Sequence, residues 1–259
     1  MHSVLSTVND LDRFNRVSGA ESNAKTVRSE GLRRTVAPVV RDVRSRFSLS
    51  FIKTSVVDER ASRLLDIIVA AIALAILLPV LLLVALAIWA RDGASPIFVH
   101  RRLGRGGTTF PCFKFRSMVV DAQTRLDHIL ETDAAAAAEW ARDQKLRNDP
   151  RITSFGEFLR KTSLDELPQL ANVLRGEMSL VGPRPIVPNE VPRYGRYFRN
   201  YCEVKPGITG LWQVSGRNDV SYRRRVALDT VYSRSRSVGF DLLILGRTVP
   251  AVLTGRGSA

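Results

Sequence analysis

The chain has 259 residues, enough for one large domain or for one domain with an extension. Its formal charge of +14 at pH 7 attracts anionic partners as a class: nucleic acid, acidic lipid and phosphorylated small molecules. Cys112 and Cys202 lie far apart, and none of the three histidines stands beside a second histidine or a cysteine at metal-ligand spacing, which leaves a disulfide framework, zinc chemistry and a histidine base unsupported.

Residues 1–57 are polar, with serine, asparagine and arginine scattered among small residues and little apolar periodicity. Segments of this composition bury too little apolar surface to offset the entropy of ordering. We therefore expect a mobile N-terminal extension, either a regulatory or membrane-touching arm or a tail without function. Residues 58–259 form the second predicted unit, which carries the remaining features.

A membrane anchor helix is predicted over residues 64–90. Residues 67–90 contain no charged side chain, and a helix of that length crosses a bilayer core of about 30 Å. Arginines flank both ends, so the usual charge asymmetry between loops is missing and both ends are expected on the cytoplasmic side. Pro79 removes a backbone donor in the middle, so the helix should bend there. Charge and proline alone fit a re-entrant hairpin and a kinked span equally well.

After the anchor, two short strands are expected at residues 96–99 and 110–115, around the turn-forming glycines of residues 104–107. Arg101, Arg102 and Arg105 follow the anchor closely and are expected to contact lipid headgroups. The predicted strands form a small β-hairpin.

Residues 119–146 have helical character, because their apolar residues share one face and the alanine run at 134–138 favours helix. Residues 240–253 are apolar but interrupted by Asp241, Arg247 and Pro250, which predicts an interfacial segment rather than a span. The expected fold class is α+β and mainly helical: a membrane helix, amphipathic interfacial helices and the small hairpin.

An acidic pair, Asp165 and Glu166, lies beside a predicted helix start. Leucines at 164, 167, 170 and 174 form a buried stripe that excludes both acids. Ser163 and Glu166 fit a capping box, and Pro168 is tolerated only near a helix start. Free backbone donors there favour an ionised carboxylate that attacks phosphorus, while Glu166 offers oxygen ligands to Mg²⁺. The plainer alternative is a capping glutamate and a solvated aspartate.

Basic blocks surround this pair in the sequence. Upstream are Lys-Phe-Arg-Ser-Met at 114–118, Asp-Pro-Arg-Ile-Thr at 149–153 and Arg-Lys at 160–161; downstream are Met-Ser-Leu-Val-Gly-Pro-Arg-Pro at 178–185 and the glycine-rich block 205–218. Two prolines flank Arg184 and lower the entropic cost of aiming its guanidinium. Gly207, Gly210 and Gly216 allow the backbone to approach a phosphate or ribose closely.

These blocks, in this order over residues 58–254, resemble the bacterial sugar transferase family, the monotopic polyprenyl-phosphate phosphoglycosyl transferases, and within it the small members that initiate exopolysaccharide synthesis. The resemblance implies a ping-pong reaction on the cytoplasmic face of the bacterial inner membrane. An aspartate attacks a UDP-sugar, UMP leaves, and undecaprenyl phosphate accepts the glucose or galactose 1-phosphate. It also implies an Mg²⁺ cofactor and leaves the oligomeric state open.

Carried over by position, the resemblance implies that Asp165 is the nucleophile and Glu166 a magnesium ligand. Phosphate and nucleotide contacts would come from a set of cationic residues: Lys114, Arg116, Arg160, Arg184 and Arg217. The family's anchor is a re-entrant helix broken at a serine-proline pair, which favours the hairpin with its break at Pro79, although Leu78 stands where serine is common.

Two other functions are compatible with parts of the sequence: a basic membrane scaffold of a polysaccharide assembly without chemistry of its own, and a glycosyl transferase that releases UDP. A nucleic-acid partner is not expected, because aromatic residues make up only 7% of the chain and no nucleic-acid motif is recognisable.

Overall fold

The structure is a computed structural model that describes residues 56–143, 146–216 and 220–253. The predicted extension, residues 1–57, falls almost entirely outside this range and stays a prediction. The helices of the described part are α3 (Val56–Asp92), η1 (Arg105–Gly107), α4 (Ala122–Thr132), α5 (Ala134–Asp143), α6 (Ser154–Lys161), η2 (Leu164–Glu166), α7 (Gln169–Arg175), η3 (Pro188–Glu190), α8 (Val191–Tyr194), η4 (Gly195–Tyr197), α9 (Phe198–Glu203), α10 (Leu211–Val214), α11 (Tyr222–Ser235) and α12 (Val238–Leu253). The strands are β1 (Ile97–Leu103), β2 (Thr109–Phe115), β3 (Ser179–Val181) and β4 (Gly207–Thr209).

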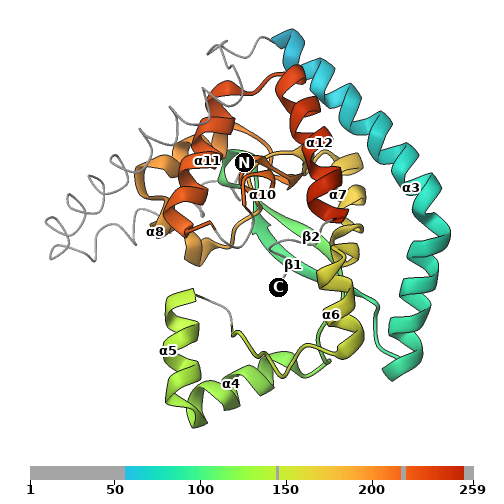
Figure 1. Ribbon diagram of the computed structural model, residues 1–259, viewed down its shortest axis with the longest axis vertical. Helices are drawn as coiled ribbons and strands as arrows, with labels where there is room; N and C mark the ends of the chain where they lie inside the picture. The colour runs from blue at the N-terminus through green and yellow to red at the C-terminus, as the bar shows by residue number, and fades with distance from the viewer. Residues whose placement is uncertain (1–55, 144–145, 217–219, 254–259) are drawn as a thin grey trace, which may run out of the picture.

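The long helix α3 runs along one side of the molecule, next to α7 and α12 (Figure 1). It is helical through Pro79 and bends along its course (Figure 1). Residues 59–92 are long and apolar enough to cross a membrane, and only 11% of their most apolar window is buried. A core helix of a soluble protein would be mostly covered, so the exposed apolar surface of α3 identifies it as a candidate for membrane insertion.

Polar side chains near the start of α3 attach this helix to the rest of the fold. The buried Asp66 carboxylate accepts hydrogen bonds from Ser179 Oγ at 3.0 Å and from the Leu180 amide at 2.8 Å. Arg63 donates to the Val173 and Leu174 carbonyls at 2.6 and 3.0 Å and so satisfies carbonyls at the end of α7. The anchor helix is therefore bonded to the first residues of β3 and to the end of α7.

Strands β1 and β2 pair in antiparallel register, with His100 opposite Cys112, which confirms the predicted hairpin. The prediction for the first strand was too short, because β1 continues to Leu103. Near its end Arg101 is exposed whereas the neighbouring Arg102 is half-buried, as expected when successive side chains of a strand point to opposite faces. Gly106 and Gly107 have φ values of 70° and 74°, which explains the glycines in the turn.

The helical character predicted for residues 119–146 is confirmed, and it is divided between two helices, α4 and α5. The break falls at Asp133, whose Oδ1 accepts hydrogen bonds from the amides of Ala135 at 2.8 Å and Ala136 at 3.0 Å. An aspartate side chain that accepts hydrogen bonds from the first amides of one helix favours a helix start there, and the preceding helix therefore ends at that residue. Together α4 and α5 form an arm at the edge of the molecule (Figure 1).

The short strands β3 and β4 pair in parallel and bring two of the sequence blocks together. A Cβ atom built on Gly207 would lie 2.0 Å from the Gly182 amide nitrogen, and one on Gly210 would lie 2.2 Å from the Gly182 carbonyl oxygen. These glycines allow two backbone segments to touch, whereas the sequence suggested an approach to phosphate or ribose. The blocks around Arg184 and Gly207 are thereby packed as one unit.

Gly207→Ala is expected to destabilise the protein by about 3 kcal/mol, because the new methyl group overlaps backbone that cannot rotate away. Thermal unfolding of the detergent-solubilised protein measures the loss. Gly239→Ala is the matched control, since a Cβ at Gly239 meets no atom within 4 Å and lies in α12. An unchanged melting temperature for Gly207→Ala would contradict the packing argument.

The core lies between α11, α12 and the β3–β4 pair, where Tyr194, Tyr201 and Tyr232 are almost completely buried. The predicted interfacial segment at residues 240–253 is the greater part of α12. Its Phe240 and Ile244 enter the core while Leu242 and Val249 are exposed, so this helix is amphipathic. A smaller cluster joins Val84 and Ile88 of α3 to Phe115 and Leu159.

Candidate active site

The acidic pair lies in the short 3-10 helix η2, between α6 and α7. The predicted capping box does not form, because the Ser163 side chain makes no cap hydrogen bond and its backbone is left-handed, with φ 59°. Instead the Glu166 amide donates to the Ser163 carbonyl oxygen at 3.2 Å. Helix α7 begins only at Gln169, so both acids precede its first turn. The tight turn directs the adjacent carboxylates to different surroundings.

Glu166 pairs with Lys114 of β2, whose Nζ lies 2.6 Å from Glu166 Oε1. Asp165 is buried, with 7% of its surface exposed. Asn172 of α7 holds this arrangement against the hairpin: its amide accepts a hydrogen bond from the Phe113 amide at 3.0 Å and donates to the Pro111 carbonyl at 2.6 Å. The strand that carries Lys114 and the helix that follows the acids are therefore fixed to each other.

A pocket opens beside the pair. Its walls come from the hairpin, from η2 and α7, and from the touching β3–β4 blocks. Its lining residues are Arg102, Cys112, Lys114, Glu166, Gln169, Arg184, Pro185, Gly207, Ile208 and Gln213. Three of these carry positive charge and one carries negative charge, so the pocket suits an anionic ligand.

The two carboxyl groups titrate differently. Burial raises the pKa of Asp165 to about 6 and Glu166 adds to the rise, while Lys114, Arg160 and Arg184 oppose it. Burial also acts to raise the pKa of Glu166, but Lys114 and Arg184 outweigh it and hold that pKa below its usual range. One acid is thus ionised throughout the neutral range, whereas the other ionises only above about pH 6.

The sequence predicted that backbone donors at a helix end would keep Asp165 ionised, and this explanation is wrong. In the described part of the chain the Asp165 carboxylate accepts no hydrogen bond, and its charge is supported by nearby cations instead. An ionised carboxylate that is desolvated and lacks hydrogen bonds keeps its lone pairs available for attack.

Three of the cations predicted for the site gather around the pair. Lys114 and Arg184 line the pocket, and Arg160, near the end of α6, is close enough to lower the pKa of Asp165. Arg116 lies elsewhere: it binds both oxygens of Asp92 at 2.6 and 2.7 Å and ties the hairpin to the end of α3. Arg217 lies outside the described residues.

The structure adds a cation that the sequence argument assigned to lipid. Arg102 lines the pocket with only 15% of its side chain exposed, so the expected headgroup contact is wrong for this residue. The neighbouring Arg101 is exposed, and Arg105 pairs with Glu59 of α3. If the predicted strand had continued beyond residue 99, the alternation of side chains along it would have placed Arg102 and Arg101 on opposite faces.

Glu166 is the residue predicted to bind magnesium, and its surroundings can be compared with what that ion requires. Among residues 56–143, 146–216 and 220–253 no group of three or more histidine, cysteine, aspartate or glutamate side chains gathers at metal-binding distance. Magnesium commonly uses one or two carboxylates and completes its shell with substrate phosphates and water. The Glu166 carboxylate, which lines the pocket, offers one such ligand, and the described residues form no all-protein cage.

Comparison with known proteins finds one family over most of the chain. The family described as "Bacterial sugar transferase" matches residues 57–255. The exopolysaccharide production protein ExoY of Sinorhizobium fredii is 48% identical over 198 residues, which cover 76% of this chain and 88% of that protein. The UDP-galactose-lipid carrier transferase of Erwinia amylovora is 52% identical over 196 residues, 76% of this chain and 41% of that protein.

A further relative is the undecaprenyl-phosphate galactose phosphotransferase of Salmonella typhimurium, 55% identical over 168 residues, which cover 65% of this chain and 35% of that protein. The chain therefore spans well under half the length of some of these relatives and nearly the whole length of ExoY.

Proposed function

Because this chain belongs to the bacterial sugar transferase family, we propose that it transfers a hexose 1-phosphate from a UDP-sugar to undecaprenyl phosphate and releases UMP. The product would be the first lipid-linked intermediate of an exopolysaccharide or related glycan. The observation that carries the proposal is the buried Asp165 carboxylate, whose charge is supported by Lys114, Arg160 and Arg184 and which adjoins Glu166 in the wall of a cationic pocket. The name of the Salmonella relative supports the lipid acceptor, that of the Erwinia relative supports a UDP-sugar donor, and that of the Sinorhizobium relative supports exopolysaccharide production.

In the first step an Asp165 oxygen attacks the phosphorus that bears the sugar. A carboxyl–phosphate ester forms as the bond between that phosphorus and the bridging oxygen breaks, and UMP leaves with the bonding electrons. Lys114 and Arg184 stabilise the charge that accumulates on the phosphate oxygens. Because Asp165 must be ionised to attack, its pKa of about 6 suits a reaction at neutral pH.

In the second step a phosphate oxygen of undecaprenyl phosphate attacks the same phosphorus, and the Asp165 carboxylate is released. This step regenerates the nucleophile without a change in its protonation. Burial of Asp165 limits the access of water, which would otherwise hydrolyse the intermediate.

Glu166 would hold a magnesium ion shared with the donor phosphates, and the ion would supply neutralisation of phosphate charge. Lys114 keeps Glu166 ionised, the form that a cation requires.

Removal of magnesium by excess chelator is expected to abolish UMP release, because the diphosphate charge would then repel the attacking carboxylate. Restoring Mg²⁺ should restore the rate. Full activity in excess chelator would contradict the role of Glu166 as a ligand, and the activity of a coupled detection enzyme in the same chelator is the control.

The most direct test of the proposed function uses purified protein, undecaprenyl phosphate and a panel of UDP-sugars. Formation of UMP together with a lipid-linked sugar phosphate is the expected result, with a hexose donor preferred. Formation of UDP would indicate a direct glycosyl transfer instead. No nucleotide release with any donor would favour a scaffold role.

We further propose that α3 is a re-entrant anchor in the inner membrane, with the catalytic part facing the cytoplasm. The bend of α3, Pro79 and the arginines at both ends support it. Single cysteines introduced at Arg60 and at Ala94, in a background without Cys112 and Cys202, should react with an impermeant maleimide from the same side of the membrane. Labelling from opposite sides would establish a span.

A further inference from the structure

Arg102 is a largely buried cation in the pocket wall that the proposed mechanism does not yet use. It lies on β1 opposite Phe110, on the same hairpin face as Lys114, and lines the same pocket as Arg184. Burial acts to raise the pKa of Glu166, and Arg102 is among the cations that lower it. Its charge therefore reaches Glu166.

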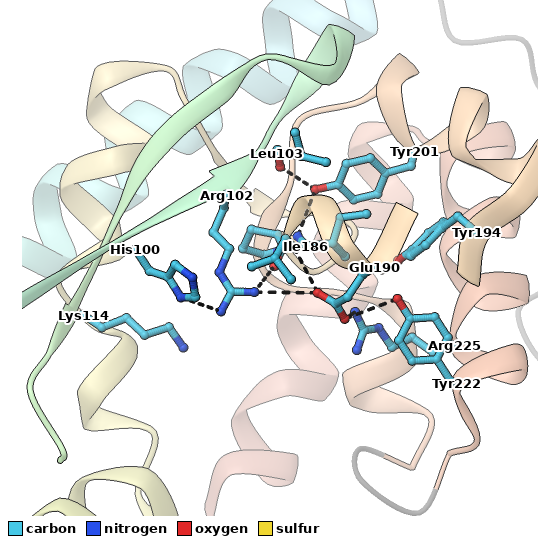
Figure 2. A network of polar contacts seen from close by, with 12 residues as sticks. His100, Arg102, Leu103, Lys114, Ile186, Glu190, Tyr194, Tyr201, Tyr222 and Arg225 are labelled. Carbon is cyan, nitrogen blue, oxygen red and sulfur yellow. Dashed lines mark hydrogen bonds and ion pairs between the residues drawn. The ribbon is translucent and has the colours of Figure 1, made fainter. Parts of the chain in front are cut away.

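Three acceptors fix the Arg102 guanidinium. Its Nη2 donates to His100 Nδ1 at 3.2 Å and its Nη1 donates to the Pro185 carbonyl at 3.3 Å, while Nη1 also lies 3.7 Å from Glu190 Oε2. Figure 2 shows the guanidinium between His100 and Glu190. Because arginine only donates, the Nδ1 atom of His100 is the acceptor and carries no proton.

Glu190 is itself held in place from several elements. Its Oε2 accepts a hydrogen bond from the Val187 amide at 3.0 Å, and its Oε1 accepts one from the Tyr222 hydroxyl at 3.3 Å. Arg225 of α11 lies 3.5 Å from the same Oε1. The carboxylate is only 16% exposed and bridges β1 and α11 (Figure 2). An acceptor fixed in this way orients an arginine at little entropic cost.

The arrangement leaves Arg102 with donors beyond those three contacts, in a pocket that Lys114 and Arg184 also line. Like charges gathered in one partly buried pocket are costly unless an anion joins them. On the basis of the proposed function, we propose that Arg102 binds a phosphate group of the UDP-sugar and that Glu190 is the residue that positions it. The arginine would be a ligand of the donor, and Glu190 would act only through it.

Titration calorimetry of the full chain in detergent with Mg²⁺ and UDP tests the first half. Arg102→Gln is expected to raise the Kd for UDP about 10- to 100-fold, the range for a hydrogen-bonded charge pair. Arg101→Gln is the matched control, because it removes the same charge from the neighbouring exposed position, and it should change Kd less than about twofold. Equal Kd values for wild type and Arg102→Gln would overturn the proposal.

If Arg102→Gln does not fold, Arg102→Lys replaces it, since the ammonium keeps the charge but loses the planar set of donors. A wild-type circular dichroism spectrum with a Kd raised several-fold is then expected. A wild-type Kd for this variant would also count against a fork-shaped phosphate contact.

Glu190→Gln tests the positioning role. It should raise Kd by about fivefold, because His100 and Pro185 still hold the guanidinium, and it should add nothing to Arg102→Gln in the double variant. Additive losses would show that Glu190 does not act through Arg102. UDP binding requires no turnover, so the Kd values test the roles of Arg102 and Glu190 independently of the proposed reaction. The proposed reaction is tested separately, and it is contradicted if the wild-type protein releases no UMP.

Discussion

Asp165→Asn is expected to lower UMP release by about 10⁴-fold or more, since loss of a covalent nucleophile has effects on that scale. The amide is nearly the same size but cannot form the carboxyl–phosphate ester. Incubation of wild type with radiolabelled donor and no lipid should leave label on Asp165, detected by mass spectrometry, and the variant should remain unlabelled. Asp121→Asn, on an exposed aspartate paired with Arg125, is the control and should retain wild-type turnover.

Asp165→Asn should also leave the fold intact and make the protein more resistant to heat at pH 8. The pKa of Asp165 is raised to about 6 in the folded protein, so the folded state holds this proton more tightly than the unfolded chain. The ionised carboxylate therefore costs stability above pH 6, and the neutral amide removes that cost.

An Asp165→Asn variant that still releases UMP at a comparable rate would eliminate the covalent mechanism and favour a scaffold or a different nucleophile.

Lys114→Met should lower turnover at pH 7 by about 10²- to 10³-fold, the range for loss of one preorganised donor to a developing anion. It should also shift the acid limb of the pH–rate profile. In wild type, activity falls as the pH drops through about 6, where Asp165 becomes protonated. Lys114 lowers the pKa of both acids, so its removal raises both and moves this limb to higher pH.

Rates measured from pH 5 to 9 check both effects. Lys161→Met is the matched control, because Lys161 forms an exposed pair with Glu157 at 2.6 Å on α6 and lies outside the pocket lining. An acid limb that stays in place after Lys114→Met would mean that this lysine does not set the ionisation of the pair.

Much of the site could be predicted from sequence because the relevant signals are local or lie in contiguous blocks. The uncharged stretch beginning at Ile67 and the glycine turn of the hairpin each report on their own segment. The predicted leucine stripe was wrong in part, because Leu174 is exposed whereas Asp165, which the stripe excluded, is buried. Lys114 and Arg184 were predicted from such blocks, and both line the pocket. The chemical role of each remains a prediction that the experiments above test.

The features that sequence reasoning missed depend on pairing or on competition between neighbours. Arg102 reaches the pocket because β1 extends to Leu103, which places residues 98, 100 and 102 on one face with their partners 114, 112 and 110. The capping box at Ser163 failed because a 3-10 turn took the place of the first helical turn. No composition or periodicity indicates that Gly182, Gly207 and Gly210 contact each other, since that contact forms only when β3 and β4 pair.

The bonds from Asp66 to the start of β3 matter for a reaction between a soluble donor and a lipid that cannot leave the bilayer. Asp66 directly precedes the exposed apolar residues Ile67 and Ile68, and β3 leads within a few residues to Arg184. With α3 inserted as proposed, a rigid connection only a few residues long would set the height of the pocket above the membrane surface. Under the proposed mechanism, a polyprenyl phosphate diffusing in the plane of the membrane would then meet the aspartyl intermediate at a constant level, without a domain movement to bring the two together.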